Sequence, residues 1–153
     1  MKIKTILCLF ITFLVSSNTF GQIDKLLGSW QPYAIDNGEF YLNIKTDSIA
    51  LYEELSYIEN DSLKISQLKE IASQLYFNQK HTFKENGKYI QHISMMNLEL
   101  DYMISASNKL LLVSENQFKD EKDAIEIPFS LKNGVLFLEL PVTEPATKLW
   151  LKK

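Results

Sequence analysis

The sequence predicts a mainly β fold, an eight-stranded antiparallel up-and-down barrel with a helical insertion after its first strand. Asn-Gly pairs occur at residues 37–38, 86–87 and 133–134. This dipeptide is a strong hairpin signal, because both residues accept positive φ angles. Alternating apolar stretches flank these pairs, and a helical pattern is confined to residues 47–78. Seven expected strands follow one another through short connections, which is typical of an antiparallel meander.

Residues 1–22 have the three parts of a secretory signal peptide. Lys2 and Lys4 precede an apolar run at 6–15, and small and polar residues follow it. Such segments are removed on export. The apolar run is shorter than the roughly 20 residues that cross a bilayer, so no membrane span is expected. We therefore expect an exported protein, periplasmic or extracellular, whose single domain comprises residues 23–153.

The composition excludes several classes of function. Removing residues 1–22 takes away two lysines and no acidic residue, so the formal net charge of −3 becomes −5. The chain contains no arginine. Nucleic-acid surfaces depend on basic fields and on bidentate arginine, so no nucleic-acid partner is expected. The one cysteine, Cys8, leaves with the signal peptide, so the mature domain has neither a disulfide nor a thiol nucleophile.

The strands of the barrel can be assigned outward from the turns. We expect them at 28–35, 79–85, 88–96, 99–106, 109–115, 124–131, 134–140 and 146–152. The last strand is expected to pair with the first, because closure removes the unpaired sheet edges that invite aggregation. At residues 133–134, a two-residue loop pairs Leu131 with Leu136 and Phe129 with Leu138, which places apolar side chains on one face.

The insertion at 47–78 is expected to be a pair of helices. Apolar residues recur at helical spacing in its second half: Leu68, Ile71, Ala72, Leu75 and Tyr76. Asp61 or Ser62 can cap that helix. The first half, 47–59, fits a helix capped at Asp47. It also fits a strand, since Ile49 and Leu51 alternate with their neighbours; we favour the helix.

The order of these elements resembles the calycin superfamily, which includes lipocalins, fatty-acid-binding proteins and lipocalin-like domains of exported bacterial proteins. The resemblance depends on Gly28-x-Trp30 in the first strand, the segment 83–89 on a central hairpin, and the closing segment 148–151. It implies that Trp30 is a structural plug across the closed end, and that the helical pair corresponds to a lid. The arginine that holds a carboxylate in fatty-acid-binding proteins has no counterpart in this chain.

An eight-stranded barrel has an interior that side chains fill or that holds one small ligand. We expect five residues to contact such a ligand: Phe83, Tyr89, Met95, Phe129 and Leu138. Adaptable methionine and aromatic side chains suit an irregular apolar molecule.

The two histidines, His81 and His92, lie on the central hairpin. A two-residue loop would place them directly opposite each other, with Cβ atoms about 5 Å apart, as a metal-binding or pH-sensitive pair. A three-residue loop would instead pair His81 with Gln91 and Phe83 with Tyr89. The aromatic pair favours this second register, in which both histidines are ordinary sheet residues and no metal site forms.

No pattern of catalytic residues or of cofactor binding is found, so the sequence predicts neither an enzyme nor a cofactor. The charged run at 119–123 is interpreted as a solvated connection, because its lysines interrupt any calcium site. Our first hypothesis is an exported lipocalin-like protein that binds a small hydrophobic or amphipathic molecule inside the barrel. The alternative is a solid barrel that docks a protein partner of the cell envelope through the outer face bearing Val135 and Phe137.

Overall fold

The computed structural model describes residues 24–105, 107, 109–113, 124–141 and 144–153. The strands are β1 (Gly28–Asp36), β2 (Phe40–Asn43), β3 (Ser48–Leu51), β4 (Lys80–Phe83), β5 (Lys88–Ile93), β6 (Met96–Ile104), β7 (Lys109–Val113), β8 (Ile125–Lys132), β9 (Val135–Leu140) and β10 (Thr147–Lys152). The helical segments are η1 (Glu53–Ile58), α2 (Ser62–Ala72) and η2 (Ser73–Phe77). The expected signal peptide and the charged run at 119–123 lie outside the described residues.

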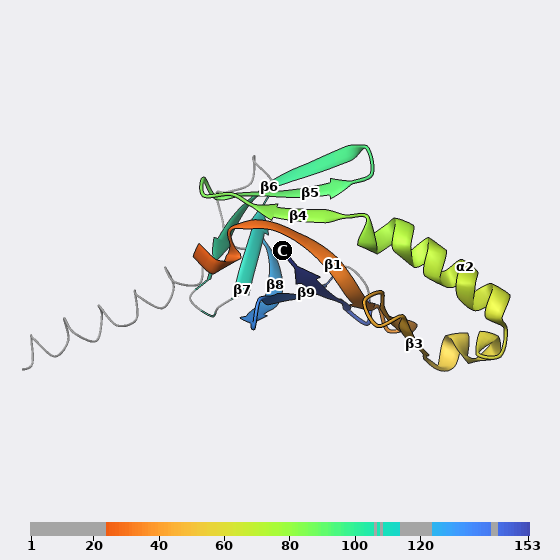
Figure 1. The fold of residues 1–153 in the computed structure, drawn as a ribbon. Coiled ribbons are helices and arrows are strands. Elements are labelled where there is room, and N and C mark those ends of the chain that lie inside the picture. Colours follow the sequence, from red (N-terminus) through yellow and green to blue (C-terminus); the bar gives the residue numbers. More distant parts are fainter. Residues whose placement is uncertain (1–23, 106, 108, 114–123, 142–143) are drawn as a thin grey trace, which may run out of the picture.

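Eight of these strands close into an antiparallel barrel. β4 to β10 form a continuous meander, and β1 pairs with β4 on one edge and with β10 on the other (Figure 1). The closing ladder joins Gln31 to Lys152 and Ile35 to Leu149. The predicted mainly β barrel is therefore confirmed, and so is the pairing of the last strand with the first. Closure leaves the eight barrel strands without an open edge.

The prediction of a helix that starts at Asp47 is wrong for the first residues of that segment. Residues 48–51 form β3, which pairs with β2 through Leu42 opposite Ile49. Asp47 has a φ of +51° in the turn between the two strands, and such an angle interrupts a helix. The β2–β3 hairpin extends the sheet beside the second half of β1. The helices consequently follow β3, not the first strand.

The helix α2 contacts the rest of the molecule through a narrow face. Asp61 caps its N-terminus by accepting a hydrogen bond from the Lys64 amide. Ala72 is buried, but Ile71 and Leu75 are each 55% exposed, so the expected apolar face is only partly covered. Figure 1 shows the helix extending away from the barrel strands. Among the described residues, no helix is both long and apolar enough to cross a membrane.

One end of the barrel is filled by aromatic side chains, and we call it the closed end. Trp30 is 2% exposed, and its Nε1 donates a 2.7 Å hydrogen bond to the carbonyl of Leu26. Phe83 is equally buried, and its ring lies 5.0 Å from that of Tyr89 and 5.2 Å from that of Tyr102. Edge and tilted ring contacts of this kind add to the stabilisation from burial.

The turn chemistry sets the register of the hairpins. At residues 133–134, Leu131 pairs with Leu136, as the two-residue loop predicts. The central hairpin has a three-residue turn, in which Gly87 adopts a φ of +76° and the Lys84 amide donates to the Lys88 carbonyl at 2.8 Å. Its register is therefore the second of the two alternatives.

Candidate ligand-binding site

A cavity of about 300 Å³ lies at the end of the barrel opposite Trp30, which we call the mouth. Its walls come from η2, from β5 to β10 and from the chain next to β4. Eight lining residues are apolar: Leu98, Leu100, Leu112, Ile125, Ile127, Leu140, Pro141 and Leu149. Five are polar and uncharged: Tyr76, Gln79, Tyr89, Gln91 and Thr147. A mostly apolar pocket with a few polar groups is typical of a small-molecule site, and this one is at the small end of the usual range.

Strand alternation explains which side chains reach the cavity. Tyr89 and Gln91 lie two residues apart on β5, so both point inward. They pair across the sheet with Leu100 and Leu98 of β6, respectively, which point the same way. Leu98 is 44% exposed, so it forms part of the rim where the cavity opens to solvent. β5 and β6 therefore form one wall of the cavity, with two polar and two apolar side chains.

Three of the polar side chains in the cavity wall take part in two hydrogen-bonded pairs. Gln91 Nε2 donates to Gln79 Oε1 at 2.6 Å, and Gln79 Nε2 donates in turn to the carbonyl of Leu75. Tyr89 Oη lies 2.6 Å from Nδ1 of His81, which is buried and does not line the cavity. These contacts fix the orientation of both polar groups before any ligand binds.

His81 is completely buried, and its environment is unusual for a histidine. Burial lowers its pKa to about 4, so the imidazole is neutral at physiological pH. Burial also raises the pKa of Tyr89, which keeps its hydroxyl protonated. In the described part of the chain, His81 Nε2 has no hydrogen-bond partner. The pair is therefore an uncharged polar contact between two strands.

The possible histidine pair does not form. His81 faces Gln91, whereas His92 faces Lys80, so the two imidazoles lie on opposite faces of the hairpin. His92 is instead hydrogen-bonded to Asn97 on the outside of the barrel. The physical reason is the extra residue in the turn, which shifts the register by one. Among the described residues, no group of three or more histidine, cysteine or acidic side chains suits a metal ion.

The five expected ligand contacts have different positions. Tyr89 lines the cavity. Phe83 and Leu138 are buried in the core, and Phe129 is half-buried against it. Met95 is 99% exposed, so the expectation that it faces the interior is wrong. The strand expected at 88–96 ends at Ile93, because the chain turns at residues 94–95.

The sequence interpretation missed most of the lining, including Gln79, Gln91 and Thr147. Alternation contains a signal for one of them, since Gln91 follows Tyr89 by two residues on one strand. A glutamine in a strand is ordinarily assigned to the outer face, because polar side chains are mostly exposed. Gln79 directly precedes β4, and Thr147 is the first residue of β10. At such positions the alternation of side chains along a strand does not predict which face of the sheet a residue occupies.

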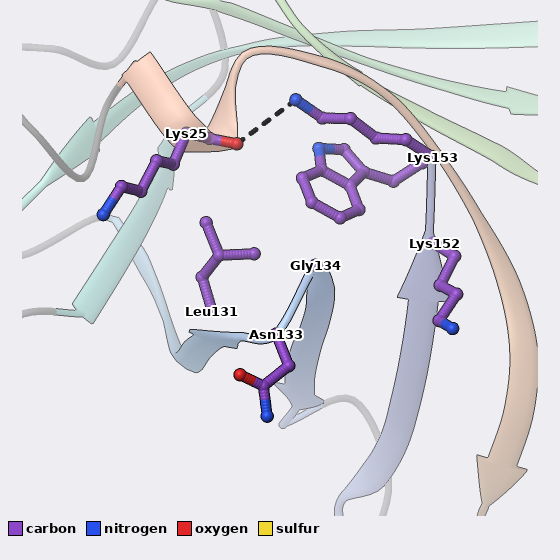
Figure 2. Close-up of a pocket in the computed structure, with 7 residues that line it drawn as sticks. Lys25, Leu131, Asn133, Gly134, Lys152 and Lys153 are labelled. Carbon is purple, nitrogen blue, oxygen red and sulfur yellow. Dashed lines mark hydrogen bonds between the residues drawn. The ribbon is translucent and has the colours of Figure 1, made fainter.

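A second and larger hollow, of about 580 Å³, lies outside the closed end. Its lining includes Lys25, Lys152 and Lys153 together with Trp30. Lys153 Nζ lies 4.9 Å from the centre of the Trp30 ring and donates to the carbonyl of Lys25 at 3.3 Å. Figure 2 shows the three amino groups pointing in different directions. They do not converge on one point, so this hollow lacks the geometry of an anion site.

The outer face proposed for docking is partly covered by its own neighbours. Phe137 is half-buried, and its ring lies 5.3 Å from that of Trp150, which in turn lies 5.9 Å from Tyr41. Val135 is also half-buried. The aromatic side chains Phe137, Trp150 and Tyr41 form an outer row across β9, β10 and β2.

The barrel and its cavity define the chain as an eight-stranded antiparallel β-barrel with one open end. No protein-family model matches the sequence, and no curated protein matches it. The fold is similar to the crystal structure of a DUF4847 family protein from Bacteroides vulgatus. The TM-score is 0.50 and the sequence identity 13%, over 83% of this chain and 92% of that one. At this identity the likeness shows the fold alone.

Proposed function

We propose that this chain is an exported, lipocalin-like binding protein that holds one small apolar or amphipathic molecule in the mouth of its barrel. The observation that carries the proposal is the cavity of about 300 Å³, which is lined by eight apolar and five neutral polar residues. The cavity has room for about ten non-hydrogen atoms, at roughly 30 Å³ for a water-sized group. The bound molecule is not chemically changed.

The rim supports entry of an apolar molecule from this end. Leu98 and Ile125 line the cavity and are each more than two-fifths exposed. Met96 lies two residues before Leu98, on the same side of β6, and is also exposed. Exposed apolar side chains beside a pocket commonly mark a ligand-binding groove.

A neutral fluorescent probe, N-phenyl-1-naphthylamine, tests the proposal. Its ten-carbon naphthyl group matches the size of the cavity, and its anilino group would extend past the open rim at Leu98 and Ile125. We expect saturable fluorescence enhancement with the purified residues 23–153. Leu98→Asp places a charge at the rim and should weaken probe binding about tenfold, because burying a charge without a partner is unfavourable. Met103→Asp is the matched control, since Met103 has nearly the same exposure on the same strand but does not line the cavity. It should leave probe affinity unchanged.

Two results would overturn the proposal: no saturable enhancement with the unaltered protein, or equal weakening by Leu98→Asp and Met103→Asp. Nuclear magnetic resonance with the same probe gives an independent reading. The amide signals of residues 89–91 and 98–100 should shift on titration, and those of Trp30 and of residues 133–134 at the closed end should not. Mass spectrometry of the protein recovered from the cell envelope or the medium tests export, since its N-terminus should lie near residue 23.

A further inference from the structure

The pair of glutamine side chains in the cavity indicates the chemistry of the ligand's polar end. We infer that the cavity selects an uncharged molecule with a hydroxyl or amide group over a carboxylate of the same length. This inference rests on the proposed function, since it specifies the occupant of the same cavity. It is carried by the hydrogen-bond chain from Leu75 through Gln79 to Gln91.

The orientation of both amides follows from the first partner in that chain. The backbone carbonyl of Leu75 can only accept, so the Gln79 amide must direct its NH₂ group toward it. Gln79 Oε1 then faces Gln91 and accepts from Gln91 Nε2 at 2.6 Å. Gln91 Oε1 is left as an acceptor, and in the described part of the chain it takes no hydrogen bond.

Gln91 lines the cavity, so this acceptor is available to a ligand that carries a proton donor. The Gln91 NH₂ group has a second hydrogen that can donate to the same ligand. A hydroxyl or a primary amide can use both atoms, since each group donates and accepts. A carboxylate only accepts, and it would place its negative charge near Gln91 Oε1.

The charge balance of the cavity acts in the same direction. All thirteen described lining side chains are uncharged, and the neighbouring His81 is neutral because its pKa is about 4. A carboxylate that left water for this environment would gain no counter-charge from these residues, which is unfavourable. An alcohol loses less hydration and regains its hydrogen bonds from Gln91. Selection against the carboxylate is therefore expected even where the apolar parts are identical.

Displacement of N-phenyl-1-naphthylamine by three matched molecules at pH 8 tests the inference. They are 1-octanol, octanoate and heptyl methyl ether, and each has about the ten non-hydrogen atoms that the cavity accommodates. We expect 1-octanol to bind at least tenfold more tightly than octanoate, because an unmet polar group or a buried charge is worth a factor of that size. The ether has the alcohol's size and oxygen but no donor, so it should bind several-fold more weakly than 1-octanol.

Single substitutions give a second reading with a matched control. Gln91→Lys adds a cation to the cavity wall and should bring octanoate at least level with 1-octanol. His92→Lys adds the same charge to the opposite face of β5, and it should leave the affinities for both molecules as they were. The ether comparison needs no variant, so it holds even if Gln91→Lys fails to fold.

The outcomes separate the inference from the function on which it rests. If octanoate binds the unaltered protein as tightly as 1-octanol, the inference is overturned while probe binding still supports a ligand cavity. If the probe binds but 1-octanol does not displace it, the inference is also overturned. If the probe does not bind, and none of the three molecules shifts the amide signals of residues 89–91 and 98–100, the proposed function fails as well.

Discussion

The two ends of the barrel are built from the same strands, yet one is filled and the other is hollow. A single cross-strand row connects them, from Trp30 on β1 through His81 and Gln91 to Leu98 on β6. At the closed end, the row begins with the large indole of Trp30, which is 2% exposed. At the mouth, it ends with a half-buried glutamine and a leucine on the rim. Alternation thus decides which residues face inward, and their size and polarity decide whether space remains.

The largest effect is expected at the closed end. Trp30→Ala removes a buried indole and its 2.7 Å hydrogen bond to the Leu26 carbonyl. It should lower the free energy of unfolding by about 3–5 kcal/mol, the range for truncating a buried aromatic residue. Urea denaturation followed by circular dichroism measures this change. Leu98→Ala at the mouth is the comparison and should lower it by less than about 1 kcal/mol, because that side chain is already close to half exposed.

Equal losses of stability in Trp30→Ala and Leu98→Ala would contradict the division into a filled end and a hollow end. The effects of the two substitutions on ligand affinity should have the opposite order to their effects on stability. N-phenyl-1-naphthylamine should bind Leu98→Ala more weakly than the unaltered protein. A folded Trp30→Ala variant should keep its affinity for the probe, since Trp30 does not line the cavity.

Between the two ends, His81 is expected to make stability depend on pH. Its pKa is about 4 in the folded protein, against about 6.5 in the unfolded chain. The unfolded chain therefore binds more protons between these values, and the free energy of unfolding falls as the pH decreases from about 6.5 to 4. The full loss is about 3 kcal/mol, and it is complete once the pH is below the folded value.

Urea denaturation at pH 7 and at pH 4.5 measures this decrease in the free energy of unfolding. The decrease in unfolding free energy should be smaller in His81→Leu, because the buried imidazole is gone. His92→Leu is the control, since His92 lies on the outer face of the same hairpin. It should retain the decrease seen in the unaltered protein. An unchanged decrease in His81→Leu would mean that other groups cause the pH dependence.

Much of the barrel could be predicted because its signals are local. The Asn-Gly pair at 133–134 sets a turn, and the alternating residues beside it set a register, so a short stretch contains the whole hairpin. β3 shows where this approach fails. Ile49 and Leu51 fit both a strand and a helix, and the decision depends on their pairing with Leu42 and Phe40 of β2. That pairing is a tertiary contact, so the local pattern does not contain it.

The candidate site was harder to predict for the same reason. Tyr89 was expected inside because aromatic residues on strands usually point to the core. Gln91 was not singled out, since only its bond to Gln79 makes a glutamine suitable there. Met95 was expected inside because its strand was extended too far. The positive φ of Ser94, +53°, places the turn three residues earlier than expected, and a serine gives little warning of such an angle.

The smallest predicted effect separates two glycines in hairpin turns at opposite ends. Gly38, at the mouth end, has a φ of +85°, and a Cβ atom there would lie 1.9 Å from Cγ of Pro145. Gly134, at the closed end, has a φ of +72° with nothing within 4 Å of that position. Gly134→Ala therefore meets only the backbone strain of a positive φ, about 1 kcal/mol. Gly38→Ala meets the same strain and a steric clash, and should be about 2 kcal/mol more destabilising. Urea denaturation of both variants measures the difference directly. Equal losses of stability would mean that the Gly38 turn and Pro145 are not packed together. The mouth end of the barrel would then be less tightly packed than the pairing of β1 with β10 implies.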